Sequence, residues 1–145
     1  MIEHGEIEAE VIEAVRAMLE PALSGMDWYD FHHMPCYDGP EGRLEVWCKQ
    51  KADAPSRTLV LRLVFRHDRV MVGIPNIFMP ESMKHERLGK RTIKAIFDAC
   101  YARSYYTLVV DLVPSFRNRL LARGAHPINH EIVQITPDTN LTRAV

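Results

Sequence analysis

The fold is decided by the stretch VMVGIPNIFMPESMKHERLGKRTIKAIFDACYARSYYTLVVDLV, residues 70–113, in which two apolar runs flank a helical pattern. Val70–Ile74 and Thr107–Val113 have the apolar, β-branched composition of buried strands. Between them, apolar residues recur at helical spacing: Leu88, Ile93, Ile96, Phe97 and Cys100. A strand, a helix and a second strand in this order form a crossover that joins parallel neighbours. The sequence therefore predicts a sheet with one parallel pair.

Antiparallel strands are predicted before this unit, because the loops between the earlier apolar runs are short. Glu6–Leu23 has the 3.6-residue apolar period of an amphipathic helix, with glutamates near its start. The predicted strands that follow are Trp28–Met34, Leu44–Lys49 and Thr58–Phe65, the last nearly all apolar, as in a strand buried on both faces. After residue 113 the sequence predicts a helix at Ser115–Arg123 and a strand at Ile132–Thr136. The expected fold class is α/β: a mixed, mainly antiparallel sheet with helices on both faces.

Length and composition are those of one domain, residues 1–145, with 47% hydrophobic residues to fill its core. The three cysteines are far apart, form no CxxC pair, and predict reduced, mostly buried thiols. His32 and His33 are adjacent, so on a strand they point to opposite faces. No His/Cys cluster has zinc spacing, and we therefore expect no metal.

The N-terminal region does not resemble a targeting segment. Met1–Glu20 is acidic and amphipathic, whereas a secretory leader is basic and then continuously apolar. No window approaches the roughly 20 apolar residues of a membrane span. We expect a cytoplasmic protein without a membrane partner.

Charge is divided unevenly along the chain. Residues 1–80 hold 8 Lys/Arg and 13 Asp/Glu, whereas residues 81–145 hold 10 Lys/Arg and 6 Asp/Glu. The second half is therefore the better place for an anion site. The net charge of −1 argues against nucleic acid as a partner, because phosphate contacts dominate that affinity.

Residues 78–91 form a basic segment at the start of the second predicted helix. Lys84, Arg87, Lys90 and Arg91 surround Gly89, near which the helix begins. The first turn of a helix has unpaired N–H groups and a partial positive charge, so it accepts phosphate. Glycine there lets the backbone approach a pyrophosphate closely. The segment predicts an anion site, and the alternative is a solvated basic loop.

The run from Phe78 to Ala125 resembles the core of the GNAT acyltransferases. That family has a strand, then an Arg/Gln-x-x-Gly-x-Gly/Ala loop that binds the coenzyme A pyrophosphate, followed by a helix, a strand and a second helix. Lys84-x-x-Arg87-x-Gly89 occupies the loop, and Phe116–Ala125 the second helix and turn. The resemblance covers about a third of the chain by motif and all of it by element order.

The resemblance implies acetyl-CoA as co-substrate and a small-molecule or peptide amine as acceptor. The coenzyme-binding residues would be Met71, Val72 and Gly73 of the strand and the segment residues Lys84, Arg87, Leu88, Gly89, Lys90 and Arg91. A lysine-like amine, with a pKa of about 10.4, must lose a proton before it attacks. The candidate catalytic residues are Asp111, Ser115 and Asn118. Asp111 has a structural alternative, which is pairing with Arg117 or Arg119 at the strand end.

Two positions depart from the family pattern. Arg87 stands at a usual glycine, and Leu120 stands where the family commonly has a tyrosine that returns a proton to the departing thiolate. These departures suit a second reading: a GNAT-fold protein without catalysis, acting as a binding or homo-oligomeric assembly component, as among the virion-associated proteins of short-tailed phages. Whether the chain is an enzyme is left open by the sequence.

Overall fold

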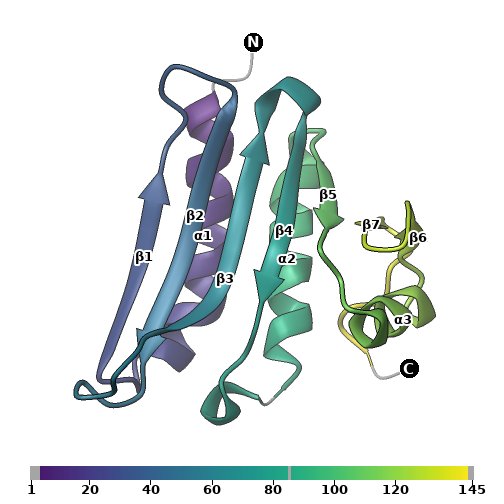
Figure 1. The fold of residues 1–145 in the computed structure, drawn as a ribbon. Helices are drawn as coiled ribbons and strands as arrows, with labels where there is room; N and C mark the ends of the chain where they lie inside the picture. The colour runs from purple at the N-terminus through teal and green to yellow at the C-terminus, as the bar shows by residue number, and fades with distance from the viewer. Residues whose placement is uncertain (1–3, 85, 144–145) are drawn as a thin grey trace.

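The computed structural model describes residues 4–84 and 86–143, and within them the chain forms one mixed sheet with three α-helices. The sheet has seven strands in the order β1-β2-β3-β4-β5-β7-β6 (Figure 1). Every neighbouring pair is antiparallel except β4–β5, which is parallel. The predicted mixed, mainly antiparallel α/β class is confirmed.

The first half of the chain is a helix followed by an antiparallel meander. Helix α1 is His4–Leu23, and strands β1 to β4 are Trp28–Met34, Glu41–Lys49, Thr58–Arg66 and Met71–Ile77. A 3-10 turn, η1 (His67–Arg69), joins β3 to β4. Strand β1 has the bounds predicted from the sequence.

The second half supplies the crossover. After the 3-10 turn η2 (Glu81–Met83), helix α2 is Leu88–Ala102 and leads to β5 (Tyr106–Val109). Helix α3 is Pro114–Ala122, and β6 (His126–Pro127) and β7 (Val133–Ile135) complete the sheet. The sequence did not predict β6, which is only a two-residue bridge.

The hydrophobic core lies between one face of the sheet and helices α1 and α2, which run side by side behind it (Figure 1). The apolar stripe predicted for α1 is buried, at Ile7, Val11, Val15, Leu19 and Leu23. The sheet contributes alternating residues to the same core: Leu44, Val46, Leu61, Leu63, Phe65, Val72 and Ile74. None of the described helices is long and apolar enough to cross a membrane.

The opposite face of β1–β3 is polar and partly exposed. Glu45 pairs with Arg62 at 2.9 Å, and Arg57 lies over the Trp47 ring on this face. Strand β3 is therefore fully buried on its helix side alone, and the expectation that it is buried on both faces is wrong. Over β1–β3, the described helices cover one face (Figure 1).

Because β4 and β5 are parallel, both strands begin at one end of the sheet and finish at the other (Figure 1). We call these two ends the amino edge and the carboxyl edge. The amino edge holds the residues that precede the two strands, together with the start of α1. The carboxyl edge holds the residues that follow the strands and the start of α2. Polar side chains gather at both edges, and their arrangements differ.

Candidate functional site

The parallel pair β4–β5 opens at its carboxyl edge. The ladder runs from Met71↔Tyr106 to Ile74↔Val109, and the Val110 amide donates to the Ile74 carbonyl at 3.1 Å. Beyond this bond lies a pocket of about 170 Å³. It is lined by residues 74–77, residues 109–113 and Phe116. Ligands of open α/β sheets bind at such carboxyl ends.

A bulge and a proline explain why the pairing stops. On β4, Ile74 and Pro75 together oppose the single residue Leu63, between the pairs Val64↔Gly73 and Arg62↔Asn76. A bulge bends its strand, and proline has no N–H to donate. The strand therefore turns away from β5 at this point.

Asp111 closes the pocket from the β5 side. Its φ of +54° is left-handed, so the chain leaves the strand direction there and β5 ends at Val109. The prediction that Asp111 lies on a strand running to Val113 is wrong for this reason. Asp111 is exposed and lines the pocket. It forms no ion pair with Arg117 or Arg119 among the described contacts.

Helix α2 begins next to this edge with an uncapped first turn. Its N-cap residue, Arg87, has a left-handed backbone (φ 55°, ψ 39°), makes no side-chain cap, and is followed by no acidic residue in the first turn. Left-handed geometry is the conformation that glycine adopts freely, and the GNAT pattern has glycine at this position. A Cβ added at Gly89 would lie 3.5 Å from Met79 Cγ, an ordinary contact.

Four cations lie around the start of α2. Burial lowers the pKa of Lys90, and the positive charges of Arg123, Arg119 and Arg87 lower it further, so these groups are close together. Among the described residues, Lys90, Arg87 and Arg119 have no carboxylate within 4.0 Å. Arg123 instead donates to the main-chain carbonyls of Asn140 and Arg143. The surface around the start of α2 therefore carries more positive charge than residues 78–91 supply by themselves.

The other cations predicted to bind coenzyme are paired with acids on the surface. Lys84 lies 3.5 Å from Glu81, and Arg91 lies 3.6 Å from Glu86. Exposed pairs of this kind are weak and exchange easily. Arg87 and Lys90 are therefore the stronger candidates for binding an anion. The sequence analysis did not predict Arg119 and Arg123, the two further cations in the α3 region.

The remaining predicted site residues are not all brought together. Met71, Val72 and Gly73 lie in the paired part of β4, before the opening. Ser115 and Asn118 are exposed on α3 and do not line the pocket. Leu120, at the usual tyrosine position, is fully buried. Of the predicted catalytic residues, the structure thus places Asp111 alone at the pocket.

A buried polar network occupies the opposite, amino edge. The Glu8 carboxylate is fully buried and contacts two histidines: Oε2 is 2.6 Å from His67 Nε2, and Oε1 is 2.8 Å from His33 Nε2. The other ring nitrogen of His67 is 2.7 Å from the Tyr105 hydroxyl. The chain makes room for this carboxylate, because a Cβ at Gly42 would lie only 2.3 Å from Glu8 Oε2.

Opposing effects set the ionisation of this network. Burial alone would raise the pKa of Glu8, but hydrogen bonds from His67, His33 and Cys36 outweigh it and lower the pKa. Burial raises the pKa of the Cys36 thiol, and its hydrogen bond to Glu8 raises it further. Burial likewise raises the pKa of Tyr105. Glu8 is therefore the charged member, while Cys36 and Tyr105 keep their protons.

Sequence reasoning missed this network. Glu8 was assigned to the helix dipole, yet it lies one residue from Ile7 and three before Val11, on the buried face of α1. An acidic residue on the apolar face of a helix indicates that a hydrogen-bonding partner for its carboxylate lies in the protein interior. The prediction for the histidine pair is consistent with the structure, since His33 contacts Glu8 and His32 lies near Glu45 on the other face.

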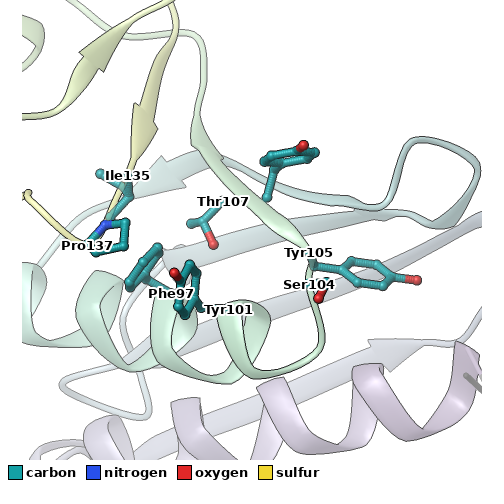
Figure 2. Close-up of a pocket in the computed structure, with 8 residues that line it drawn as sticks. Phe97, Tyr101, Ser104, Tyr105, Thr107, Ile135 and Pro137 are labelled. Carbon is teal, nitrogen blue, oxygen red and sulfur yellow. The ribbon is translucent and has the colours of Figure 1, made fainter.

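A larger and more apolar pocket lies between the end of α2 and strands β5 and β7 (Figure 2). Its volume is about 420 Å³, and Phe97, Tyr101, Ile135 and Pro137 are among the residues that line it. The buried Thr107 hydroxyl has no hydrogen-bond partner among the described residues. The pocket has aromatic walls but no charged group, so it offers little for catalysis.

Taken together, the carboxyl edge combines an open strand pair, an uncapped helix start and clustered cations, whereas the amino edge holds a closed network. Comparison with known proteins adds no assignment to either edge: no family model, no curated protein and no solved structure matches the chain significantly.

Proposed function

We propose that the chain has a GNAT-like fold and is an N-acyltransferase that moves an acetyl or acyl group from coenzyme A to an amine. The observation that carries the proposal is the juxtaposition at the carboxyl edge of β4–β5. There, a pocket lies between the diverging parallel strands, and α2 begins at the same edge with several cations nearby and no acid in its first turn (Figure 1).

The coenzyme diphosphate is assigned to the first turn of α2. The N–H groups of Leu88, Gly89 and Lys90 have no partner within the helix, and they point along the positive end of its dipole. Arg87 and Lys90 add charge-assisted hydrogen bonds to phosphate oxygens. Arg119 and Arg123 extend the positive surface toward α3, where a further phosphate group of the coenzyme can be neutralised.

The acyl-pantetheine arm is assigned to the opening between β4 and β5. The Phe78 amide donates to Val60 on β3 at 2.8 Å. Successive residues of a strand alternate, so the Ile77 amide faces the opposite way, toward the opening. A thioester carbonyl that accepts this hydrogen bond is polarised for attack, as in an oxyanion hole.

Asp111 is assigned as the base that takes a proton from the amine. Its carboxylate is the acidic group among the residues that line the pocket. Proton removal gives a neutral nitrogen that attacks the thioester carbonyl and displaces the coenzyme thiolate. The thiolate takes its proton from solvent, because Leu120 is buried and has no proton to give.

The experiment is a calorimetric titration with acetyl-CoA, followed by an assay of released coenzyme thiol with lysine peptides and polyamines as acceptors. Arg87→Ala should weaken acetyl-CoA binding about tenfold, since a hydrogen bond to a charged group contributes about 1.5–3 kcal/mol. Arg69→Ala is the matched control, because Arg69 is an exposed cation in η1 at the other edge.

Asp111→Asn separates chemistry from binding. Asparagine tolerates the left-handed backbone at this position, so acetyl-CoA affinity should be unchanged while kcat falls by about 10²–10⁴-fold. No heat of binding and no rise in melting temperature with acetyl-CoA would refute the proposal. Binding without turnover of any acceptor would instead support a binding or assembly protein, the role that the buried Leu120 favours.

A further inference from the structure

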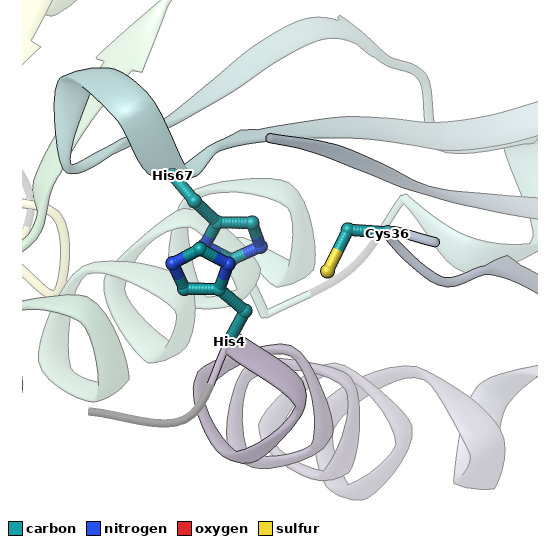
Figure 3. A group of neighbouring side chains, drawn as sticks. All are labelled: His4, Cys36 and His67. Carbon is teal, nitrogen blue, oxygen red and sulfur yellow. The ribbon is translucent and has the colours of Figure 1, made fainter. Parts of the chain in front are cut away.

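The amino edge of β4–β5 brings together three metal-ligating side chains from distant parts of the chain. His4 begins α1, Cys36 follows β1, and His67 begins η1. One nitrogen from each imidazole and the Cys36 sulfur all lie within 4.8 Å of one another. Figure 3 shows the two imidazoles stacked, with the Cys36 thiol pointing toward them. Their ring centroids are 4.1 Å apart.

A fourth donor, Glu8, lies beside this group, in contact with His67 and Cys36. Glu8 follows His4 by one helical turn, so both side chains are on one face of α1. Its carboxylate is fully buried, accepts a hydrogen bond from Cys36, and lies 2.6 Å from His67 Nε2. The donors are therefore two imidazoles, one thiol and one carboxylate.

Outer hydrogen bonds hold two of these donors in fixed orientations. The Tyr105 hydroxyl lies 2.7 Å from His67 Nδ1, which leaves Nε2 directed at Glu8. His33 Nε2 holds the other oxygen of Glu8 at 2.8 Å. Metal-bound histidines and carboxylates usually have this kind of second hydrogen bond, which fixes the ring tautomer and the orientation of the ligand.

We propose that this cluster is a binding site for a divalent transition metal of the zinc type, with four ligands: His4, Glu8, Cys36 and His67. Nitrogen, sulfur and oxygen donors of this kind are those that Zn²⁺ takes in proteins. A thiolate and a carboxylate together balance the two positive charges of the ion, which suits a partly buried site. The site lies at the edge opposite the coenzyme pocket and does not depend on the proposed function.

The fit requires a local rearrangement. The His4 ring must turn out of its stack on His67, because the lone pairs of two parallel rings do not meet at one ion. Glu8 and His67 must also separate from their 2.6 Å contact to let the ion between them. Ligand atoms of a tetrahedral zinc site lie about 3.3–3.6 Å from one another, given Zn–N and Zn–S bonds of about 2.0–2.3 Å. The 4.8 Å limit for His4, Cys36 and His67 therefore exceeds the bound geometry by about 1.2–1.5 Å. His4 is exposed in the first turn of α1, so its side chain can close this distance, and it gives the ion a route from solvent.

Metal binding exchanges protons for the ion. The Cys36 thiol loses its proton to solvent, and its sulfur binds the metal. The proton on His67 Nε2 moves to Nδ1, where the Tyr105 oxygen accepts it, since a phenol can accept as well as donate. Because Glu8 is already ionised, about one proton leaves for each ion bound. Affinity should therefore rise with pH.

The test is a Co²⁺ titration of the full chain without an added histidine tag, followed by absorption. Cobalt reports a thiolate ligand by a sulfur-to-metal charge-transfer band and tetrahedral geometry by intense visible bands. We expect one Co²⁺ per chain with both features, displaced by one equivalent of Zn²⁺. Zn²⁺ should also raise the melting temperature, and a chelator should reverse this.

Three variants assign the ligands. Cys36→Ser should abolish the charge-transfer band, and His4→Ala should weaken Co²⁺ binding at least tenfold. His130→Ala is the matched control, an exposed histidine outside the cluster, and should leave binding unchanged. The proposal is overturned if folded native protein gives no charge-transfer band at saturating Co²⁺, or if Cys36→Ser keeps it. An equal loss of affinity in His130→Ala would also overturn it.

Discussion

The two edges of the parallel pair β4–β5 treat charge in opposite ways. At the amino edge, the buried Glu8 carboxylate has hydrogen-bond partners on both of its oxygens. At the carboxyl edge, Lys90 and Arg119 lie near one another, with no carboxylate partner among the described residues. A buried charge must be paired, or the fold loses stability. Clustered cations beside a helix start are instead available to an anion.

The contrast separates stability from binding. In the metal-free protein, changes at the amino edge should alter the free energy of unfolding, whereas changes at the carboxyl edge should alter acetyl-CoA affinity with little effect on folding. Four predictions test this separation, in order of decreasing effect.

Glu8→Ala should have the largest effect, lowering the free energy of unfolding by about 3–5 kcal/mol, because breaking a buried charged network leaves its partners unsatisfied. The measurement is urea denaturation in the presence of a chelator. Glu10→Ala is the control, since Glu10 lies on the same helix but is exposed and pairs with Arg103. Equal losses in the two variants would show that Glu8 has no special role.

Gly42→Ala should destabilise the fold by about 1–3 kcal/mol, as overpacking does, because the new Cβ would lie 2.3 Å from Glu8 Oε2. Alanine is otherwise acceptable in a strand, so the effect measures the space reserved for the carboxylate. Gly39→Ala is the matched control, with nothing within 4 Å of its added Cβ. A stable Gly42→Ala protein would contradict the packing around Glu8.

Gly89→Glu should weaken acetyl-CoA binding about tenfold or more, by placing a negative charge where the diphosphate is assigned. Stability should be unchanged, since an acid near a helix start is favourable and the added Cβ makes an ordinary contact with Met79. Gly39→Glu adds the same charge in an exposed turn and should bind normally. Calorimetry compares the two, and equal affinities would remove the assigned diphosphate site.

Acid pH should remove the contribution of Glu8 gradually. Against the effect of burial, its hydrogen bonds hold the folded pKa below the usual glutamate value of 4.5, so the unfolded chain binds more protons between these two pKa values. The stabilisation is therefore complete above about pH 4.5 and is lost as pH falls through the folded pKa. The difference in unfolding free energy between native protein and Glu8→Gln should shrink over this window. A constant difference would contradict the lowered pKa.

Local patterns were enough to predict most of the elements. The apolar stripe of α1 and the bounds of β1 depend on neighbours within one element, and both predictions were correct. The errors lie where backbone geometry overrides composition. Asp111 adopts a left-handed conformation and ends β5 early, and the bulge at Ile74–Pro75 lets β4 continue to Ile77.

The candidate sites divide in the same way. The basic segment around Gly89 was predicted because its residues are neighbours in sequence. The contribution of Arg119 and Arg123 was not predicted, because these residues are distant from Lys90 in sequence and approach it only when the chain folds. The network around Glu8 was beyond local reasoning, since Glu8 and His67 are 59 positions apart. The one local sign was an acid on the buried face of α1.

Amide hydrogen exchange of the native chain, with and without acetyl-CoA, tests most directly whether the carboxyl edge binds the coenzyme. We predict slower exchange on addition of acetyl-CoA in two places, the first turn of α2 at Leu88–Arg91 and the strand end at Asn76–Ile77, with no change in β1 or β2. Protection confined to β1–β3, or no protection anywhere at saturating acetyl-CoA, would contradict the account.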